Sequence, residues 1–194
     1  MTSKQRVLIC EDEGLTMMQL RKTLIHAGYD VVGETPDGEE ACKLASELKP
    51  DLILMDIQLH TINGIEATRR IVRERPTAII MLTAFGDELL VNKAIELGVS
   101  TYLVKPVGTQ QLIPAVKLAL ARFETLETVK QENEDLKDSL ETRKLVERAK
   151  GILMEHKGLV ESDAYRRLQK TSRDKCQSMK QTCLDVINAM KILS

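Results

Sequence analysis

The chain has 194 residues, a formal net charge of −1, 29% charged residues and 3% aromatic residues, with no tryptophan. This length allows one large domain or a standard domain with a small appendage, and the composition favours a helix-rich soluble protein. The average charge hides an asymmetry, because residues 142–194 hold 12 Lys/Arg against 6 Asp/Glu, while residues 1–141 hold 16 against 23. An acidic body with a basic tail indicates a polyanionic partner for the tail; a tail that is merely well solvated is the alternative.

The cysteines and the apolar runs exclude several classes of protein. Cys10, Cys42, Cys176 and Cys183 lie in apolar or helical contexts without C-x-x-C spacing. They indicate free thiols in a reducing compartment and exclude a disulfide or zinc framework. No signal peptide precedes the first strand, and no apolar run approaches the length of a membrane span. We therefore expect a cytoplasmic protein with no membrane partner.

Short apolar runs alternate with helical patterns through the first ~120 residues, which is typical of β/α units around a parallel sheet. The expected strands are Val7–Cys10, Val31–Gly33, Leu52–Met55, Ile79–Leu82 and Tyr102–Val104. The expected helices are Leu15–Ala27, Asp37–Leu48, Gly64–Arg75, Glu88–Leu97 and Thr109–Ala121. These repeats predict an α/β fold with a flavodoxin-like, doubly wound, five-stranded parallel sheet, whose ligands bind at the carboxyl ends of the strands.

An all-α region is expected after this sheet. No helix breaker follows Pro114, so one long helix is predicted from Leu112 to Glu155. It contains an a/d seam with a polar residue at one a position: Leu126, Val129, Asn133, Leu136 and Leu140. Such a seam favours a parallel coiled-coil dimer, and packing on the chain's own C-terminal helices is the alternative. Two more helical patterns follow Gly158, a residue that suits a helix C-cap, and predict a small three-helix bundle.

Three carboxylates follow two strands whose carboxyl ends should converge. Glu11 and Asp12 end the first strand, and Asp56 ends the third. At ~5 Å and an effective dielectric of about 20, each like-charge pair costs roughly 3 kcal/mol, which bound Mg²⁺ would relieve. Thr83 and Lys105 end the fourth and fifth strands. A hydroxyl and an ammonium beside a metal-bound carboxylate are the parts needed to place a phosphoryl group on Asp56 and hold it.

This constellation resembles the receiver domain of two-component response regulators over residues 5–121. The resemblance implies that Asp56 accepts a phosphoryl group from a sensor histidine kinase, while Lys105 pairs with the phosphate. It implies that Thr83 and Tyr102 form a switch pair, in which the hydroxyl moves toward the phosphate and the ring follows. The implied ligands of Mg²⁺ are Glu11, Asp12, Asp56 and the backbone carbonyl of Gln58. The receiver would be no enzyme beyond its own phosphoryl transfer and autodephosphorylation.

One position departs from the receiver pattern. Receivers usually carry proline four residues after the phosphoacceptor, and here that position is His60. A more mobile loop and an altered lifetime of the aspartyl phosphate are the expected consequences. His60 as a metal ligand or acid/base group is an alternative to a plain loop histidine, but the pocket needs hard oxygen ligands, which favours the plain loop role.

The basic C-terminal region resembles the ANTAR family of RNA-binding antitermination modules. The match is strongest in AKGILM (149–154) and in AYRRL (164–168), and it weakens after Leu168. The candidate RNA-binding residues are Arg148, Lys150, Arg166, Arg167, Lys170, Arg173 and Lys175. Tyr165 is expected in the bundle core, with stacking on a loop base as the alternative. Val160 stands where the family often has Ser or Thr as the helix N-cap, which costs ~1 kcal/mol.

The two resemblances imply a receiver domain (1–121), a coiled-coil linker helix (122–141) and an ANTAR-like three-helix domain (142–194). The expected function is a phosphorylation-controlled regulator that forms a homodimer and binds hairpin RNA of nascent transcripts, which causes antitermination. Two alternatives stay open at this point. One is a DNA-binding response regulator, although no helix-turn-helix spacing is recognisable, and the other is a receiver whose coiled coil docks a protein partner.

Overall fold

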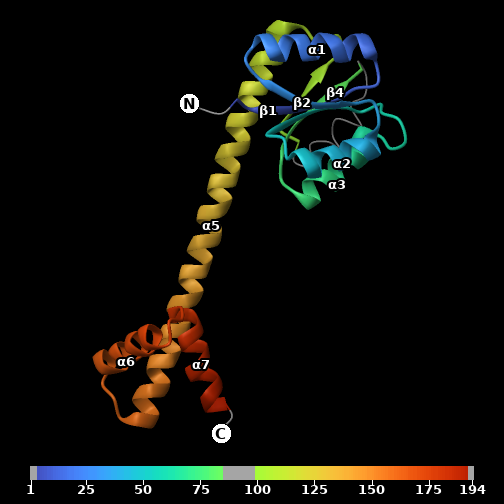
Figure 1. Ribbon diagram of the computed structural model, residues 1–194. Helices are drawn as coiled ribbons and strands as arrows, with labels where there is room; N and C mark the ends of the chain where they lie inside the picture. The colour runs from blue at the N-terminus through green and yellow to red at the C-terminus, as the bar shows by residue number, and fades with distance from the viewer. Residues whose placement is uncertain (1–3, 85–98, 192–194) are drawn as a thin grey trace. The chain divides into compact units, whose positions relative to one another are not determined.

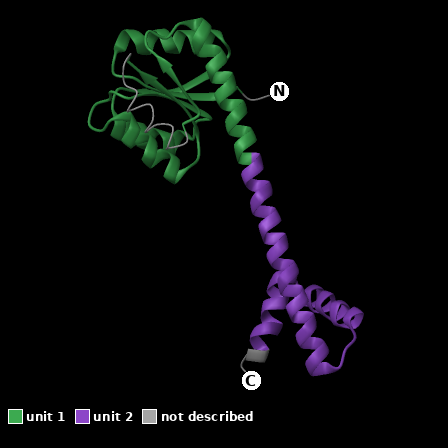
Figure 2. Cartoon of the chain, turned by 180° about the vertical axis from the view of Figure 1, so that it is seen from behind, with its two compact units in different colours: residues 1–127 green, residues 128–194 purple. Residues whose placement is uncertain are grey.

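The computed structural model describes residues 4–84 and 99–191. The chain divides into two compact units, residues 1–127 and 128–194, which are coloured separately in Figure 2. The first unit is α/β and the second is all-α, and one helix contributes to both. The helix expected at Glu88–Leu97 lies outside the described residues. Among the described helices, none combines the length and the apolar character that crossing a membrane requires.

The first unit alternates strands and helices as the apolar pattern predicts. Its strands are β1 (Arg6–Cys10), β2 (Asp30–Thr35), β3 (Leu52–Asp56), β4 (Ala78–Thr83) and β5 (Thr101–Val104). Its helices are α1 (Gly14–His26), α2 (Gly38–Leu48), α3 (Gly64–Glu74) and the first part of α5 (Thr109–Lys157). Each strand is one to three residues longer than expected, because the backbone ladder continues into residues that flank the apolar run on one or both sides.

All strand pairs in the sheet are parallel, and the strand order is β2-β1-β3-β4-β5. The predicted flavodoxin-like sheet is therefore confirmed. The order reverses beside β1, so the carboxyl ends of β1 and β3 flank the crevice where doubly wound folds bind their ligands.

The sheet is covered on both faces, as Figure 1 shows with α1 on one side and α2 and α3 on the other. Alternate strand residues such as Leu8, Ile53 and Ile79 pack with α2 and α3, while the intervening residues pack with α1 and the start of α5. Because both faces are buried, β1, β3 and β4 are continuous apolar runs.

The second unit is a three-helix bundle formed by α5, α6 (Glu161–Asp174) and α7 (Met179–Lys191). Its buried core takes two residues from each helix: Ala149, Leu153, Ala164, Leu168, Cys183 and Ile187. The predicted bundle is therefore confirmed. Tyr165 is a correction, because 41% of this residue is exposed and the core consists of aliphatic and cysteine side chains. Helical phase explains the difference, since Tyr165 follows Ala164 by about 100° and is turned away from the core.

The helix ends behave largely as the sequence predicts. α5 ends at Lys157, and Gly158 follows with a φ of +62°, the left-handed conformation of a C-terminal glycine cap. Val160 precedes α6 without a side-chain cap, as expected. Glu161 and Asp163 lie in the first turn, where their charges interact favourably with the helix dipole and offset part of the missing cap.

α5 is continuous over 49 residues, which confirms the long helix predicted from Leu112 to Glu155. The residues of the predicted seam are exposed in the single chain, and Leu136 and Leu140 are 70% and 58% exposed. These two leucines do not belong to the apolar cluster of the bundle. In the second unit, therefore, these leucines do not pack on the chain's own C-terminal helices, which was the alternative to the dimer seam.

Candidate functional site

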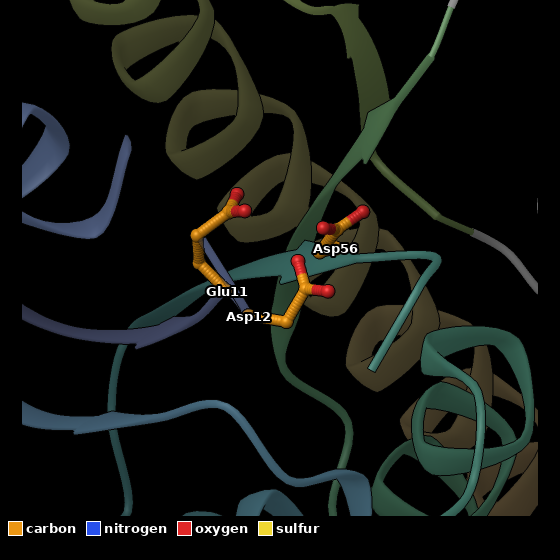
Figure 3. Close-up of side chains that lie close together, drawn as sticks. All are labelled: Glu11, Asp12 and Asp56. Carbon is orange, nitrogen blue, oxygen red and sulfur yellow. The ribbon is translucent and has the colours of Figure 1, made fainter. Parts of the chain in front are cut away.

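The acidic residues predicted to converge do so at the carboxyl ends of β1 and β3. Glu11, Asp12 and Asp56 each place one carboxylate oxygen within 4.8 Å of the others. Figure 3 shows the three side chains gathered at these two strand ends. Glu11 and Asp56 are buried, at 1% and 3% exposure, whereas Asp12 is exposed. The cluster therefore opens to solvent on the side of Asp12.

Two glycines allow the loop after Asp56 to turn tightly. A Cβ atom on Gly64, at the start of α3, would lie 1.8 Å from the backbone oxygen of Asp56. The Gly64 N–H donates to the Ile57 carbonyl oxygen at 2.9 Å. On the neighbouring loop, a Cβ on Gly38 would lie 2.3 Å from the Ile62 carbonyl oxygen. These close approaches leave no room for a side chain at either position.

Lys105 brings a positive charge to the cluster from the end of β5. Its Nζ lies 2.6 Å from Glu11 Oε1 and 2.5 Å from Asp56 Oδ2. Its backbone N–H donates to the Thr83 carbonyl oxygen at 2.8 Å, which anchors the strand end beside β4. The ammonium thus bridges two buried carboxylates that come from different strands.

The burial of these carboxylates perturbs their protonation. Burial and the nearby charge of Asp56 raise the pKa of Glu11 from 4.5 to about 7, although the hydrogen bond from Lys105 acts in the opposite direction. Burial likewise raises the pKa of Asp56, against the hydrogen bonds from Lys105 and from the Gln58 N–H, the latter at 3.1 Å. The positive charge of Lys105 is therefore too small to keep both buried carboxylates, Glu11 and Asp56, fully ionised.

The donor set fits a hard divalent cation. Glu11 Oε2 is buried and has no hydrogen-bond partner among the described residues. A buried, unpartnered carboxylate oxygen is costly, and metal coordination is one way of satisfying it. Oxygen ligands with one open, solvated side suit Mg²⁺, which retains water molecules and accepts phosphate oxygens. The residues present therefore fit the ion that the sequence predicts.

The second unit separates the predicted RNA-binding residues into two kinds. Six of them are exposed: Arg148, Arg166, Arg167, Lys170, Arg173 and Lys175. Lys150 is different, because it is 8% exposed and its Nζ contacts Glu147 at 2.9 Å and Glu161 at 2.6 Å. Its ammonium links α5 to the first turn of α6 through two exposed glutamates. Lys150 therefore joins two helices of the bundle, and its expected role as an RNA contact stays a prediction.

Comparisons with known proteins agree with this division into two units. Residues 7–117 match the response regulator receiver domain, and residues 134–187 match the ANTAR domain. The chain is 42% identical over 186 residues to the transcriptional regulatory protein PdtaR of Mycobacterium tuberculosis, which covers 96% of this chain and 91% of that protein. The chain belongs to the response regulators that join a receiver domain to an ANTAR domain.

The receiver resembles proteins with other outputs as well. The chemotaxis protein CheY of Thermotoga maritima is 38% identical over 113 residues, which is 58% of this chain and 94% of CheY. The solved receiver domain of a modulated diguanylate cyclase from Desulfovibrio desulfuricans is 33% identical with a TM-score of 0.60, and the match covers 63% of this chain and 98% of that one. The receiver is thus shared among many regulators, and the second unit distinguishes this response regulator.

The predicted switch residues lie on adjacent strands of the receiver. Thr83 is buried and its hydroxyl donates to the Ala84 carbonyl oxygen at 3.1 Å. Thr83 pairs in register with Val104, and Tyr102, two residues earlier on β5, shares the face of Val104. Tyr102 is 46% exposed. The arrangement places both side chains on one face of the sheet, and their coupled movement stays a prediction.

The His60 loop of this response regulator is joined to the loop before α2 by backbone hydrogen bonds. The His60 N–H donates to the Pro36 carbonyl oxygen at 3.0 Å, and the His60 carbonyl accepts from the Gly38 N–H at 3.1 Å. Thr61 donates its hydroxyl to Asp37 on the same neighbouring loop. Proline could not make the first of these bonds because it has no N–H. The backbone of His60 therefore holds this loop to the neighbouring one, the altered mobility of the loop stays a prediction, and the exposed side chain does not belong to the acidic cluster.

Sequence reasoning missed the roles of two glycines and of one ion pair. Gly38 and Gly64 follow Asp37 and Asn63, whose side chains cap α2 and α3. The dipeptides Asp-Gly and Asn-Gly are turn signals that could have marked both positions. The pairing of Lys150 with Glu161 had no local signal, because it depends on how two helices cross.

Proposed function

We propose that this response regulator accepts a phosphoryl group on Asp56 from a sensor histidine kinase, dimerises through α5, and binds hairpins in a nascent transcript to cause antitermination. The observation that carries the proposal is the contact of Asp56 with Lys105 inside a buried acidic cluster. The presence of an exposed basic surface on the ANTAR unit supports the output. The relative PdtaR is itself named a transcriptional regulatory protein.

The proposed chemistry at Asp56 is a direct displacement at phosphorus. An Asp56 oxygen forms the new O–P bond while the P–N bond to the kinase histidine breaks, and that histidine retains the bonding electron pair. Mg²⁺, held by Glu11, Asp12, Asp56 and the Gln58 carbonyl, would supply charge neutralisation at the phosphoryl oxygens. Lys105 Nζ already lies 2.5 Å from Asp56 Oδ2 and is placed to pair with a phosphoryl oxygen.

Proposed signalling to the rest of the receiver starts at Thr83. Its hydroxyl donates to the Ala84 carbonyl, a bond that it has to exchange in order to reach a phosphoryl oxygen on Asp56. Tyr102 lies on the same face and is half exposed, and its ring would move into the space that the Thr83 hydroxyl leaves. A change at the pocket would thereby alter the surface of the receiver and bias dimerisation.

The two faces of α5 support a dimer that keeps its bundles intact. Lys180 of α7 contacts Asp138 and Glu141 on α5 at 2.7 and 2.6 Å. Asp138 lies two residues from both Leu136 and Leu140, so it is on the opposite side of the helix from the seam. A second copy could therefore pack along the exposed seam without displacing α7. Asn133, at an a position of the seam, would favour a parallel register.

The exposed basic residues of the ANTAR unit suit structured RNA. Phosphate contacts supply affinity, whereas sequence is read at unpaired loop bases because the major groove of duplex RNA is deep and narrow. A dimer presents two such units, and two hairpins on one transcript then bind with a high effective concentration. A modest shift toward the dimer would become a large change in RNA occupancy.

The decisive test measures mass and RNA binding together. Acetyl phosphate with Mg²⁺ should convert the protein to a dimer in light scattering and raise its affinity for a two-hairpin RNA, and Asp56→Ala should abolish both effects. Leu136→Asp should prevent the dimer, whereas Glu134→Gln, off the a/d seam, should not. Equal mass and equal binding with and without acetyl phosphate would contradict the phosphorylation switch. Tighter binding to duplex DNA than to hairpin RNA at matched salt would instead favour a DNA-binding regulator.

A further inference from the structure

Tyr165 is the one aromatic residue in the sequence from 128 to 194. The bundle does not bury it, since 41% of the residue is exposed while its neighbour Ala164 is fully buried. Large aromatic side chains contribute strongly to a core when they are buried, and a bundle of this size has little apolar area to spare. The bundle therefore leaves part of this ring accessible to a partner.

One side of α6, about 100° from Tyr165, carries a basic stripe. Arg166, Lys170 and Arg173 are spaced by four and three residues, so they lie along one side of the helix, and all three are exposed. Tyr165 lies about 100° from Arg166 on one side and about 100° from the buried Ala164 on the other. The ring thus occupies the border between the core and the cations. The Arg166 side chain is 76% exposed, and its ion pair with Asp163 is long, at 3.7 Å.

We propose that the Tyr165 ring stacks on an unpaired base of the RNA while Arg166, Lys170 and Arg173 contact the flanking phosphates. This inference rests on the proposed RNA-binding function and names the side chain that reads a base. An aromatic face beside a row of cations is the combination that holds single-stranded nucleotides, because the ring stacks on the base and the cations neutralise the backbone. An apolar protein partner would gain little from the three cations, whereas an RNA uses both the ring and the cations.

The contribution of stacking can be estimated from other nucleic-acid-binding proteins. Base stacking on an aromatic side chain contributes about 1–3 kcal/mol per base, which corresponds to roughly a five- to hundredfold change in the dissociation constant. A tyrosine ring has few rotatable bonds, so ordering it on binding costs little entropy. The position is thus suited to specificity for an unpaired base, in addition to the sequence-independent phosphate contacts.

The experiment uses the full chain, activated with acetyl phosphate, and a pool of stem–loop RNAs with a fixed stem and a randomised loop. RNAs selected by the wild type are measured against Tyr165→Phe and Tyr165→Leu. Tyr165→Phe should retain wild-type affinity, and Tyr165→Leu should lose roughly five- to hundredfold. Both variants should unfold thermally at the wild-type temperature, because the ring is half exposed.

A second arm identifies the partner of the ring. Each loop nucleotide of a selected RNA is replaced in turn by an abasic one, and at one position the difference between wild type and Tyr165→Leu should disappear. Arg166→Gln should instead weaken binding to every RNA and lower the salt dependence by about one phosphate contact.

The outcomes separate the two proposals. A wild type that binds none of the RNAs overturns both the proposed function and the stacking. Normal RNA binding by Tyr165→Leu, an equal loss in Tyr165→Phe, or a loss that persists at every abasic position overturns the stacking alone. A Tyr165→Leu chain that fails to dimerise and binds RNA normally per dimer would assign the ring to a protein contact.

Discussion

Lys105 in the first unit and Lys150 in the second each bridge two carboxylates, and the surroundings of the two lysines are opposite. Lys105 bridges Glu11 and Asp56, whose side chains are 0% and 4% exposed. Lys150 bridges Glu147 and Glu161, whose side chains are 63% and 68% exposed. The buried pair of carboxylates is poorly solvated and one Glu11 oxygen is left unpartnered, whereas water solvates the partners of Lys150. The same pairing of one ammonium with two carboxylates therefore forms a buried acidic cluster in one unit and a surface link between helices in the other.

Gly64 in the receiver is closely surrounded, whereas Gly151 in the second unit is open to solvent, so substitution of Gly64 should have the larger effect. Gly64→Ala would place a Cβ 1.8 Å from the Asp56 backbone oxygen, so the β3–α3 loop would have to move. We expect a loss of unfolding free energy of at least about 4 kcal/mol, measured by urea denaturation. A stable, normally phosphorylated Gly64→Ala protein would show that this loop yields more easily than its packing suggests.

Removal of Lys105 should have the next largest effect. Lys105→Met leaves Glu11 and Asp56 without their shared cation, and breaking a buried ion pair from one side costs about 3 kcal/mol. Denaturation in buffer with a metal chelator should show this loss, and added Mg²⁺ should recover part of it. An equal stability of Lys105→Met and wild type in the chelator would mean that the two carboxylates are not ionised together.

The pH dependence of stability should report the raised pKa of Glu11. Because its pKa in the folded state is about 7 and its ordinary value is 4.5, the folded state binds the extra proton between these values. Stability from this group is complete below the ordinary value and is lost as the pH rises through the folded value, with a slope approaching about 1.4 kcal/mol per pH unit. Urea unfolding in chelator across this range measures the slope, and Glu11→Gln should flatten it.

Lys150 should matter less for stability and not at all for RNA contact. Lys150→Met keeps the aliphatic part of the side chain and removes only ion pairs with exposed glutamates. We expect a small fall in melting temperature and unchanged RNA affinity, whereas Arg148→Met, an exposed neighbour on α5, should weaken RNA binding. A loss of RNA affinity in Lys150→Met without loss of melting temperature would return Lys150 to the binding surface.

Gly151 should give the smallest change, and in the opposite direction. It lies inside α5, and a Cβ there would meet nothing within 4 Å. Gly151→Ala should therefore raise the free energy of unfolding by about 0.5–1 kcal/mol, measured by thermal denaturation of the full chain. If Gly151→Ala destabilised the protein, α5 would have to be in close contact at this position with another molecule, such as a second copy of the chain.

Much of the receiver could be predicted from the sequence because its signals are local. Continuous apolar runs and their alternation with helices predict a parallel sheet, and polar residues directly after each run must then lie at its carboxyl edge. Glu11, Asp12 and Asp56 therefore meet wherever the sheet forms. Likewise, the lack of helix breakers after Pro114 was enough to predict a continuous α5, and the positive φ of Gly158 follows from its place after the last turn.

The remaining features depend on how separate elements pack, which the local pattern does not contain. Whether Lys150 faces an RNA or Glu161 depends on the crossing of α5 and α6, and whether Tyr165 is core or surface depends on a helical phase difference of one residue. The hydrogen bond from the His60 N–H to the Pro36 carbonyl joins two residues that are 24 positions apart in the chain. By itself the sequence determined the elements and which polar residues lie at the strand ends. Only the tertiary structure decided which charged and aromatic side chains remain available to a partner, because that depends on contacts between residues far apart in the chain.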